Sequence, residues 1–455
     1  MQNSRFSKFE RWYLYLLFFE LFAGGGGRLI TFGPLSIRQL LFGGLLVIYL
    51  VRLCLDAQAR NELAQLFKRP GEPIFWVIAA LTGWIFVSGL IGLVNGHAAG
   101  LVVTDVLRVI YVLIAFPFFY YIRPARFTMK DFLQVVIWSS FVVGLLTVGI
   151  SLTAKALPGA EFMKFYDLMN RLLPGDLFFR PSGGVFYKSM FVSMFMLVIG
   201  SIAVLDRKAT WFVGMVTMLS AVSIVLSESR GLILGYVLGL VVYLLVRLVV
   251  YLWGNRQSIA TSRKMRVFQV IFLITAFGLS FYFYKNSTIA RFGGDLPGER
   301  VSVAQDSGSK HEDTSMSSRF ILMSDSIKLV RSSAARTVVG HGYGTTIGTR
   351  KTGIEMSFID ILVEQGAIGF LLWLAIGLLP LYYYFRSFRR TGELTTVHIG
   401  LLASTIAMLL VTNINPFLNS PIGLGFLLAV IMIAYELFDG KQAASRGNMS
   451  VNADY

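Results

Sequence analysis

Residues 317–370 read SSRFILMSDSIKLVRSSAARTVVGHGYGTTIGTRKTGIEMSFIDILVEQGAIGF and combine two helical patterns with a glycine-rich segment. In residues 317–331 apolar side chains recur on one helical face, which predicts an amphipathic helix on or near a membrane surface. The glycines that follow, from Gly340 to Gly348, predict a turn-rich loop, because glycine adopts backbone angles that other residues avoid. A second helix is predicted to begin near Glu355 and to lead into the apolar run from Ala367.

The same stretch gathers ionisable side chains just before the chain re-enters apolar sequence, namely Arg319, Arg331, Arg336, His341 and Glu355. A carboxylate at a helix start is stabilised in its ionised form, so Glu355 is a candidate proton acceptor. Each residue type also has an ordinary interpretation. A glutamate in the first helical turn often only compensates the helix dipole, and arginines beside a membrane often anchor lipid head groups.

The composition places the chain outside the soluble globular class. Of its 455 residues, 55% are hydrophobic and only 15% are charged, whereas a soluble domain carries about 25% charged residues. The single cysteine, Cys54, leaves no disulfide framework and no cysteine metal site. The formal net charge of +16 is spread over short loops between apolar runs, so it indicates membrane topology and no nucleic-acid partner.

The apolar runs predict an all-α polytopic membrane protein with about 12 transmembrane helices, the first of them retained at the N-terminus. The predicted spans begin near Trp12, Ile37, Ile74, Leu101, Phe132, Val185, Trp211, Leu232, Val267, Ala367, Val397 and Ile422. An even number of spans puts both termini on one side. Dense basic residues occur on alternate short loops, which predicts that these loops and both termini are cytoplasmic.

The opposite face holds the longer segments, and the chain divides accordingly. Residues 1–285 are expected to form about nine spans with an outer loop near 153–184, and residues 286–366 a large outer loop with amphipathic helices. Residues 367–440 are expected to form the last three spans, and residues 441–455 a cytoplasmic tail. Within the first outer loop, a short surface helix is predicted between two prolines, Pro158 and Pro174.

Three further positions on this face carry candidate chemistry. Arg180 lies in a proline- and glycine-containing turn at the membrane rim. Glu228 and Arg230 lie at a junction between two apolar helices, where ionisable residues are functional candidates, although a mutually neutralising pair that shapes a turn is the alternative. The consecutive residues 311–313, His-Glu-Asp, fit a solvated charge run better than a metal site, because they lack a second ligand group at regular spacing.

Three blocks in this order resemble the O-antigen ligase and O-antigen polymerase (Wzy) superfamily. Residues 226–231, LSESRG, are similar to its Ser-Arg-Gly junction. Ser318-Arg319 with residues 339–344, VGHGYG, resembles its second arginine and Gly-x-Gly segment, and residues 355–369, EMSFIDILVEQGAIG, resemble its third block. Arg180 with Gly183 is similar to a fourth. The third block of the ligases usually opens with His-Asn, whereas this one opens with Glu355-Met356, which favours the polymerase branch.

The resemblance implies a GT-C-like inner-membrane enzyme that acts at the periplasmic face, without a cofactor or metal. It implies an inverting glycosyltransferase that joins polyprenyl-pyrophosphate-linked repeat units of O-antigen or exopolysaccharide, with such glycans as both donor and acceptor. Arg230 and Arg319 would bind the pyrophosphate, and Glu355 would receive or orient the proton of the acceptor hydroxyl. The remaining candidates for substrate contacts are Arg180, Glu228, Arg336, His341 and Tyr343. A flippase and a chain-length regulator are possible protein partners, besides the lipid bilayer.

Three alternatives stay open at this point. A ligase that transfers finished polymer to lipid A-core would use nearly the same donor site. A secondary transporter or flippase also has about twelve spans with buried charge, although no pair of Pro/Gly-broken helices matches between the two halves. A structural scaffold for the polysaccharide machinery would tolerate loss of Arg230 and Arg319.

Overall fold

The structure, a computed structural model, describes residues 4–27, 30–32, 35–68, 72–253, 263–287, 314–348, 350, 353–354, 356–414 and 416–451. The helices among these residues are α1 (Ser4–Ala23), α2 (Ile37–Leu55), α3 (Ala57–Phe67), α4 (Pro73–Val94), α5 (Ala99–Val109), η1 (Ile110–Ile114), α6 (Ala115–Tyr121), α7 (Met129–Ala156), α8 (Gly159–Leu172), α9 (Met190–Leu205), α10 (Trp211–Leu226), α11 (Arg230–Trp253), α12 (Arg263–Asn286), α13 (Thr314–Val330), α14 (Ala334–Val339), α15 (Ser357–Thr391), α16 (Thr396–Val411) and α17 (Pro421–Val451). The strands form two antiparallel hairpins, β1 (Thr31–Phe32) with β2 (Leu35–Ser36) and β3 (Leu177–Phe179) with β4 (Val185–Tyr187).

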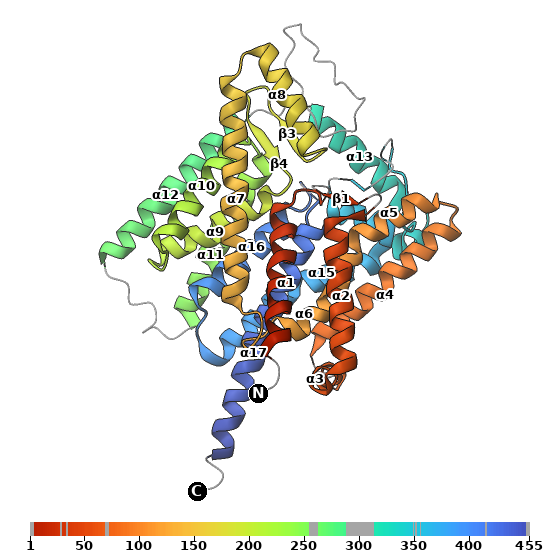
Figure 1. Cartoon of the computed structure of the whole chain (residues 1–455), viewed down its shortest axis with the longest axis vertical. Helices are drawn as coiled ribbons and strands as arrows, with labels where there is room; N and C mark the ends of the chain where they lie inside the picture. Colours follow the sequence, from red (N-terminus) through yellow and green to blue (C-terminus); the bar gives the residue numbers. More distant parts are fainter. Residues whose placement is uncertain are drawn as a thin grey trace.

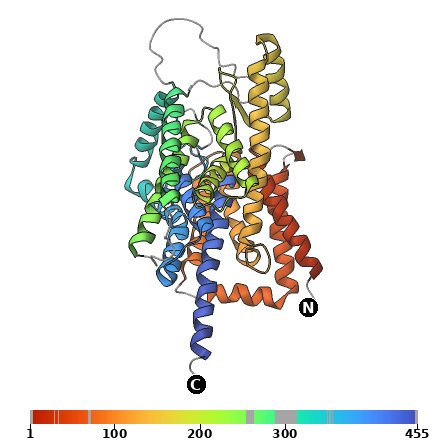
Figure 2. The same ribbon diagram turned by 90° about the vertical axis from the view of Figure 1, so that its left-hand side faces the viewer.

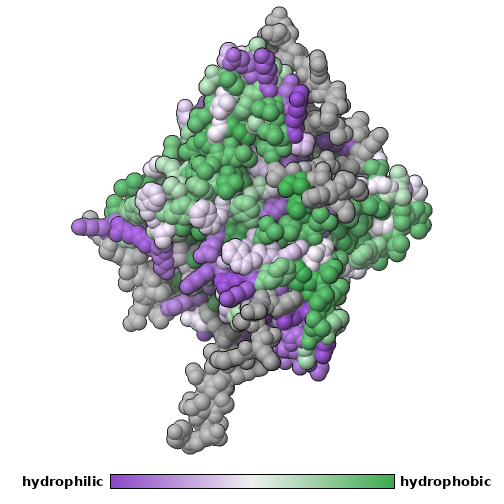
Figure 3. Space-filling view, viewed as in Figure 1, coloured by the Kyte–Doolittle hydropathy of each residue, from purple (hydrophilic) through white to green (hydrophobic). Residues whose placement is uncertain are grey.

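Within the described residues, eight helical segments are long and apolar enough to cross a membrane. They are α2, α4, α5 through α6, α7, α11, α12, α15 and the first part of α17, while α9, α10 and α16 are apolar but shorter. Large apolar side chains such as Leu55 and Trp211 are about 80% exposed on these helices, and apolar residues cover much of the face seen in Figure 3. Such a surface suits lipid better than water. The prediction of an all-α, multi-pass membrane protein is therefore confirmed.

A helix is found at each of the twelve positions where a span was expected, α1 included, although twelve membrane crossings stay a prediction. One expected start is wrong. Residues 185–187 pair with β3 as strand β4, so helix α9 begins only at Met190. α3 was not expected, since its eleven residues are too few and too polar to span. The Asp56 side chain caps α3 by accepting a hydrogen bond from the Gln58 amide.

The bundle has two distinct ends (Figure 1). The start of α1 and the end of α17 lie at one end, called here the basal end, and α8 with the β3–β4 hairpin lies at the opposite, apical end. The turned view shows α3 lying across the basal end (Figure 2). α17 is central, because 83% of the residues in its apolar stretch are buried, whereas α12 is peripheral, because only 6% of the residues in its apolar stretch are buried. The first outer loop expected from the sequence, near residues 153–184, thus lies at the apical end.

The predicted helices of the apical end are confirmed. α8 occupies the segment between the two prolines, and α13 covers the amphipathic stretch. α15 begins at Ser357, two residues after the expected start, and continues past the expected boundary at residue 366 to Thr391. Gly366 has non-helical angles, φ 64° and ψ −168°, so the helix is kinked there. The expected boundary between loop and span therefore coincides with a kink inside one helix.

Candidate functional site

The junction between α10 and α11 is held by Arg180. The last carbonyl groups of a helix lack intrahelical partners, and a buried junction must supply donors to them. Arg180, only 6% exposed, donates from Nε to the Ser227 carbonyl oxygen at 3.0 Å and from Nη2 to that of Glu228 at 3.4 Å. The Ser182 hydroxyl donates to the Glu228 carboxylate. Glu228 has φ +52°, a left-handed conformation that only strong local contacts hold in a residue other than glycine.

Arg230 opens α11 directly after this junction. Its guanidinium donates to the Ser287 carbonyl oxygen at 2.8 Å and lies 5.6 Å from the centre of the Tyr284 ring at the end of α12. The N-terminus of a helix carries partial positive charge, so the start of α11 adds positive charge beside the guanidinium groups of Arg180 and Arg230. Arg180, Glu228 and Arg230 are thus brought together at the apical end, where two guanidinium groups and a helix N-terminus lie near a single carboxylate, which leaves a net positive charge.

The glycine-rich loop docks on the kink of α15. Because the helix is interrupted at Gly366, carbonyl groups in the preceding turn are released from intrahelical bonding. The amide of His341 donates to the Val363 carbonyl oxygen at 2.8 Å, and the amide of Gly342 donates to that of Glu364 at 2.9 Å. A Cβ at Gly366 would lie 2.5 Å from the Gly340 nitrogen, so the two backbones touch. The glycines of this segment therefore allow the backbones of the loop and of α15 to approach closely.

The end of α4 holds the same loop from the other side. The Asn95 side chain donates to the His341 carbonyl oxygen at 2.8 Å, and the His97 ring lies 2.8 Å from the Tyr343 carbonyl oxygen. Gly92 has no room for a side chain, because a Cβ would overlap the Tyr343 backbone. Asn95 and His97 are therefore loop-binding residues.

His341 links α13, α14 and the loop. Arg336 donates to its Nδ1 at 3.1 Å, so Nδ1 carries no proton, and Nε2 donates to the Leu329 carbonyl oxygen at 2.9 Å. Burial lowers the pKa of His341, and the positive charge of Arg336 lowers the pKa further, against the bond to Leu329, which raises it. Both ring nitrogens are engaged in a neutral imidazole. His341 therefore positions Arg336, which is exposed at the apical surface.

Tyr343 does not face the apical surface, since its side chain is fully buried. It lies beside a group of charged residues that sequence reasoning missed, formed by Asp105 and Arg108 of α5 with Asp360 and Glu364 of α15. The signal that could have found them is the spacing of ionisable residues, i,i+3 in the span predicted from Leu101 and i,i+4 in the helix predicted from Glu355. This group is called the Arg108 cluster below.

The start of α15 is tied to the turn that precedes α17. The Ser357 hydroxyl donates to the Asn419 side-chain oxygen at 2.8 Å and accepts from the Thr412 hydroxyl at 2.9 Å. Glu355, two residues earlier, lies outside the described residues. Arg319 lies on α13, and its side chain is likewise outside what the structure describes.

The Arg230 junction and the start of α15 lie near each other at the apical end. Gly235 is five residues along α11 from Arg230, about 7.5 Å at helical rise, and it packs against Val411 at the end of α16. Thr412, the next residue, hydrogen-bonds Ser357 through both its backbone and its side chain. The two groups of candidate residues are thus separated by little more than the end of α16.

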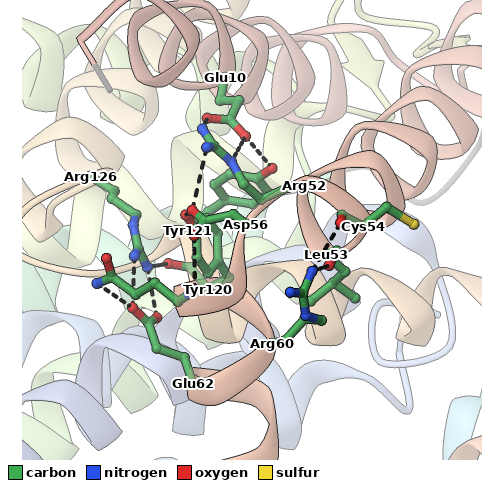
Figure 4. Close-up of polar contacts among 11 residues, drawn as sticks. Glu10, Arg52, Leu53, Cys54, Asp56, Arg60, Glu62, Tyr120, Tyr121 and Arg126 are labelled. Atoms are coloured by element: carbon green, nitrogen blue, oxygen red, sulfur yellow. Dashed lines mark hydrogen bonds and ion pairs between the residues drawn. The ribbon is translucent and has the colours of Figure 1, made fainter. Parts of the chain in front are cut away.

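The basal end has a polar network of a different kind (Figure 4). Arg52 pairs with Glu10 at 2.6 Å, Arg126 pairs with Glu62 at 2.8 Å, and Tyr121 donates to Glu10 at 2.6 Å. Glu10, Arg52, Tyr121 and Arg126 line a cavity of about 260 Å³. Because each of these cations is matched by a carboxylate of the chain, the network joins α1, α2, α3 and the segment after α6 and is a poor candidate for binding an anion.

Among the residues that the structure describes, no group of three His, Cys, Asp or Glu side chains is arranged to hold a metal ion. Residues 311–313 lie outside them. A scan against models of known protein families and a search of curated proteins found no match to this chain.

Proposed function

We propose that the chain is a glycosyltransferase that polymerises polyprenyl-pyrophosphate-linked oligosaccharide repeat units at the periplasmic face of a bacterial inner membrane. The observation that carries the proposal is the apical junction, where Arg180, Arg230 and the N-terminus of α11 converge beside the membrane-embedded bundle. A pyrophosphate on a lipid carrier is the ligand that this combination of charge and position suits.

The orientation follows from charge. The basal end carries basic residues such as Arg60 in α3, Arg126 after α6 and Arg390 at the end of α15, which favours the cytoplasm for that end. The apical end then faces the periplasm. The polyprenyl chain of the substrate would stay in the bilayer, and its pyrophosphate would meet the apical arginines at the membrane rim.

The reaction is a single displacement. The hydroxyl oxygen of the acceptor sugar attacks the anomeric carbon of the donor, and the bond from that carbon to the pyrophosphate oxygen breaks with its electron pair on the pyrophosphate. Arg230 and Arg319 stabilise the leaving group, because planar guanidinium groups match phosphate oxygens. Glu355 accepts the proton of the attacking hydroxyl. The configuration at the anomeric carbon inverts.

The proposal is tested by the glycan profile of a knockout strain complemented with wild type, Arg230→Ala, Arg319→Ala or Glu355→Gln, with membrane levels checked by blot. The three variants are expected to leave single repeat units on the lipid carrier. Arg60→Ala, an exposed arginine at the basal end, is the matched control and is expected to restore long chains.

Two results would change the assignment. Long chains that accumulate on the lipid carrier but are missing from lipid A-core would identify a ligase. A normal profile in Arg230→Ala and Glu355→Gln would show that the apical groups are not the active site.

A further inference from the structure

The Arg108 cluster joins α5 to α15 and contacts the glycine-rich loop. Arg108 Nη2 lies 2.9 Å from Asp360, 3.4 Å from Glu364 and 3.9 Å from Asp105. The three carboxylic side chains are at most 2% exposed, while the arginine retains partial exposure. Buried charges of this kind are usually costly relative to an apolar core of equal volume, so their presence calls for a role beyond stability.

The cluster binds the backbone of the loop at two separate points. Asp105 accepts a hydrogen bond from the Gly344 amide at 3.0 Å. Asp360 accepts one from the Ile354 amide at 3.1 Å. The segment between these points, which begins in the glycine-rich loop and ends one residue before Glu355, is therefore fastened at both ends to one group of charges.

Gly353 lies directly against the cluster. A Cβ at this position would overlap the Arg108 guanidinium and would lie 2.7 Å from Asp360 Oδ2. The backbone of residue 353 can occupy this place only without a side chain. The loop thus closes over the cluster next to Ile354, the residue that precedes Glu355.

The other side of the cluster reaches the start of α15 through Asn419. Its Nδ2 donates to Asp360 Oδ2 at 2.9 Å, and its Oδ1 accepts from the Ser357 hydroxyl at 2.8 Å. Asp360 therefore joins Ile354 directly and Ser357 through one buried amide. The two residues flank Glu355 at positions −1 and +2.

We propose that Arg108 and Asp360 are positioning residues for Glu355, because they hold the chain at Ile354 before it and, through Asn419, at Ser357 after it. The role of Glu355 rests on the proposed function. The contacts of Arg108 and Asp360 with Gly353, with Ile354 and, through Asn419, with Ser357, called the clamp below, do not depend on that function. Asp360 fixes the backbone on both sides of Glu355, and Arg108 fixes Asp360. Charged groups suit this task, because an ion pair with directed hydrogen bonds specifies one register where apolar packing tolerates several.

The test uses Gly353→Ala, which pushes the loop off the cluster without removing a charge. Gly83→Ala is the matched control, because a Cβ at Gly83 meets nothing within 4 Å. Arg108→Gln is the second variant. The first readout is the rate of tryptic cleavage after Arg350 and Lys351 in the purified full-length chain in detergent. The second is kcat and KM for a lipid-linked repeat unit.

Gly353→Ala and Arg108→Gln are expected to speed cleavage at these two bonds and to lower kcat about tenfold or more, since small displacements of a reacting group are costly. The KM for the donor is expected to stay unchanged, because Arg230 lies on α11, whereas Arg108 and Asp360 lie on α5 and α15. A loss of fold would instead change both kinetic constants and cleavage elsewhere in the chain.

Unchanged cleavage in Gly353→Ala would overturn the clamp, and faster cleavage with unchanged kcat would overturn the positioning of Glu355. If wild type itself turned over no lipid-linked glycan, the proposed function would fail, and the cleavage comparison would still decide whether the clamp exists.

Discussion

Replacing Gly366 by alanine tests the kink on which the glycine-rich loop docks. Gly366 has φ 64° and ψ −168°, a region that residues with a side chain avoid. A Cβ there would overlap the Val338 carbonyl oxygen and would lie 2.5 Å from the Gly340 nitrogen. Both are backbone atoms, so no side-chain rotation relieves the contact. The helix is therefore expected to straighten or the loop to detach.

The expected change in the free energy of unfolding has two contributions, backbone strain and lost hydrogen bonds. Backbone strain at such an angle costs about 1–3 kcal/mol. Detachment also breaks the bonds from the His341 amide to Val363 and from the Gly342 amide to Glu364. Each such bond contributes about 0.5–1.5 kcal/mol. Gly366→Ala is therefore expected to lower the free energy of unfolding by about 2–6 kcal/mol.

The assay is denaturant unfolding of the purified chain in detergent micelles, with hydrogen exchange at the amides of His341 and Gly342 as a local readout. Gly83→Ala, in open space on α4, is the control and is expected to raise the free energy of unfolding by about 0.5–1 kcal/mol, because alanine favours a helix interior over glycine. If Gly366→Ala unfolded like wild type and kept both amides protected, the docking of the loop on the kink would be refuted.

Three further predictions concern the apical groups. Burial and the positive charge of Arg336 lower the pKa of His341 in the folded protein. The neutral imidazole therefore stabilises the fold above the unfolded pKa of about 6.5, and this contribution is lost as the pH falls through the lower folded pKa. Thermal unfolding from pH 7 to pH 5 should show this loss, and His341→Gln should abolish it. Asn419→Ala removes two buried hydrogen bonds to Asp360 and Ser357 and should cost about 2–4 kcal/mol in denaturant unfolding; an equal stability would contradict those contacts. Arg180→Lys keeps the charge but cannot bond two carbonyl groups in the same fork, so shorter chains at normal membrane level are expected, whereas full-length polymer would show that the fork is dispensable.

The helical architecture was predictable because it depends on local composition. Runs of about 20 apolar residues specify membrane helices, and the paired prolines at 158 and 174 bracket α8 as expected. The hairpin β3–β4 was missed because its strands have only three residues each, and only Lys188 and Ser189 separate the apolar sequence of β4 from α9. Periodicity does not separate so short a strand from the start of a helix.

The candidate site was predictable in part. The junction of Arg180, Glu228 and Arg230 was found, because ionisable residues between apolar helices are conspicuous. The Arg108 cluster was missed, because Arg108 and Asp360 lie 252 positions apart and meet only in the folded bundle. Tyr343 was expected at a substrate, yet its neighbours in the fold bury it. Long-range contacts of this kind are set by tertiary packing, which one sequence does not encode locally.

The most direct measurement of the central claim is elongation of a lipid-linked repeat unit by the purified chain in detergent, where no compartments exist and transport cannot contribute. The account predicts a ladder of lipid-linked oligomers with wild type, and none with Arg230→Ala or Glu355→Gln at equal protein. A ladder of the same length from these variants, or no elongation by wild type, would contradict it.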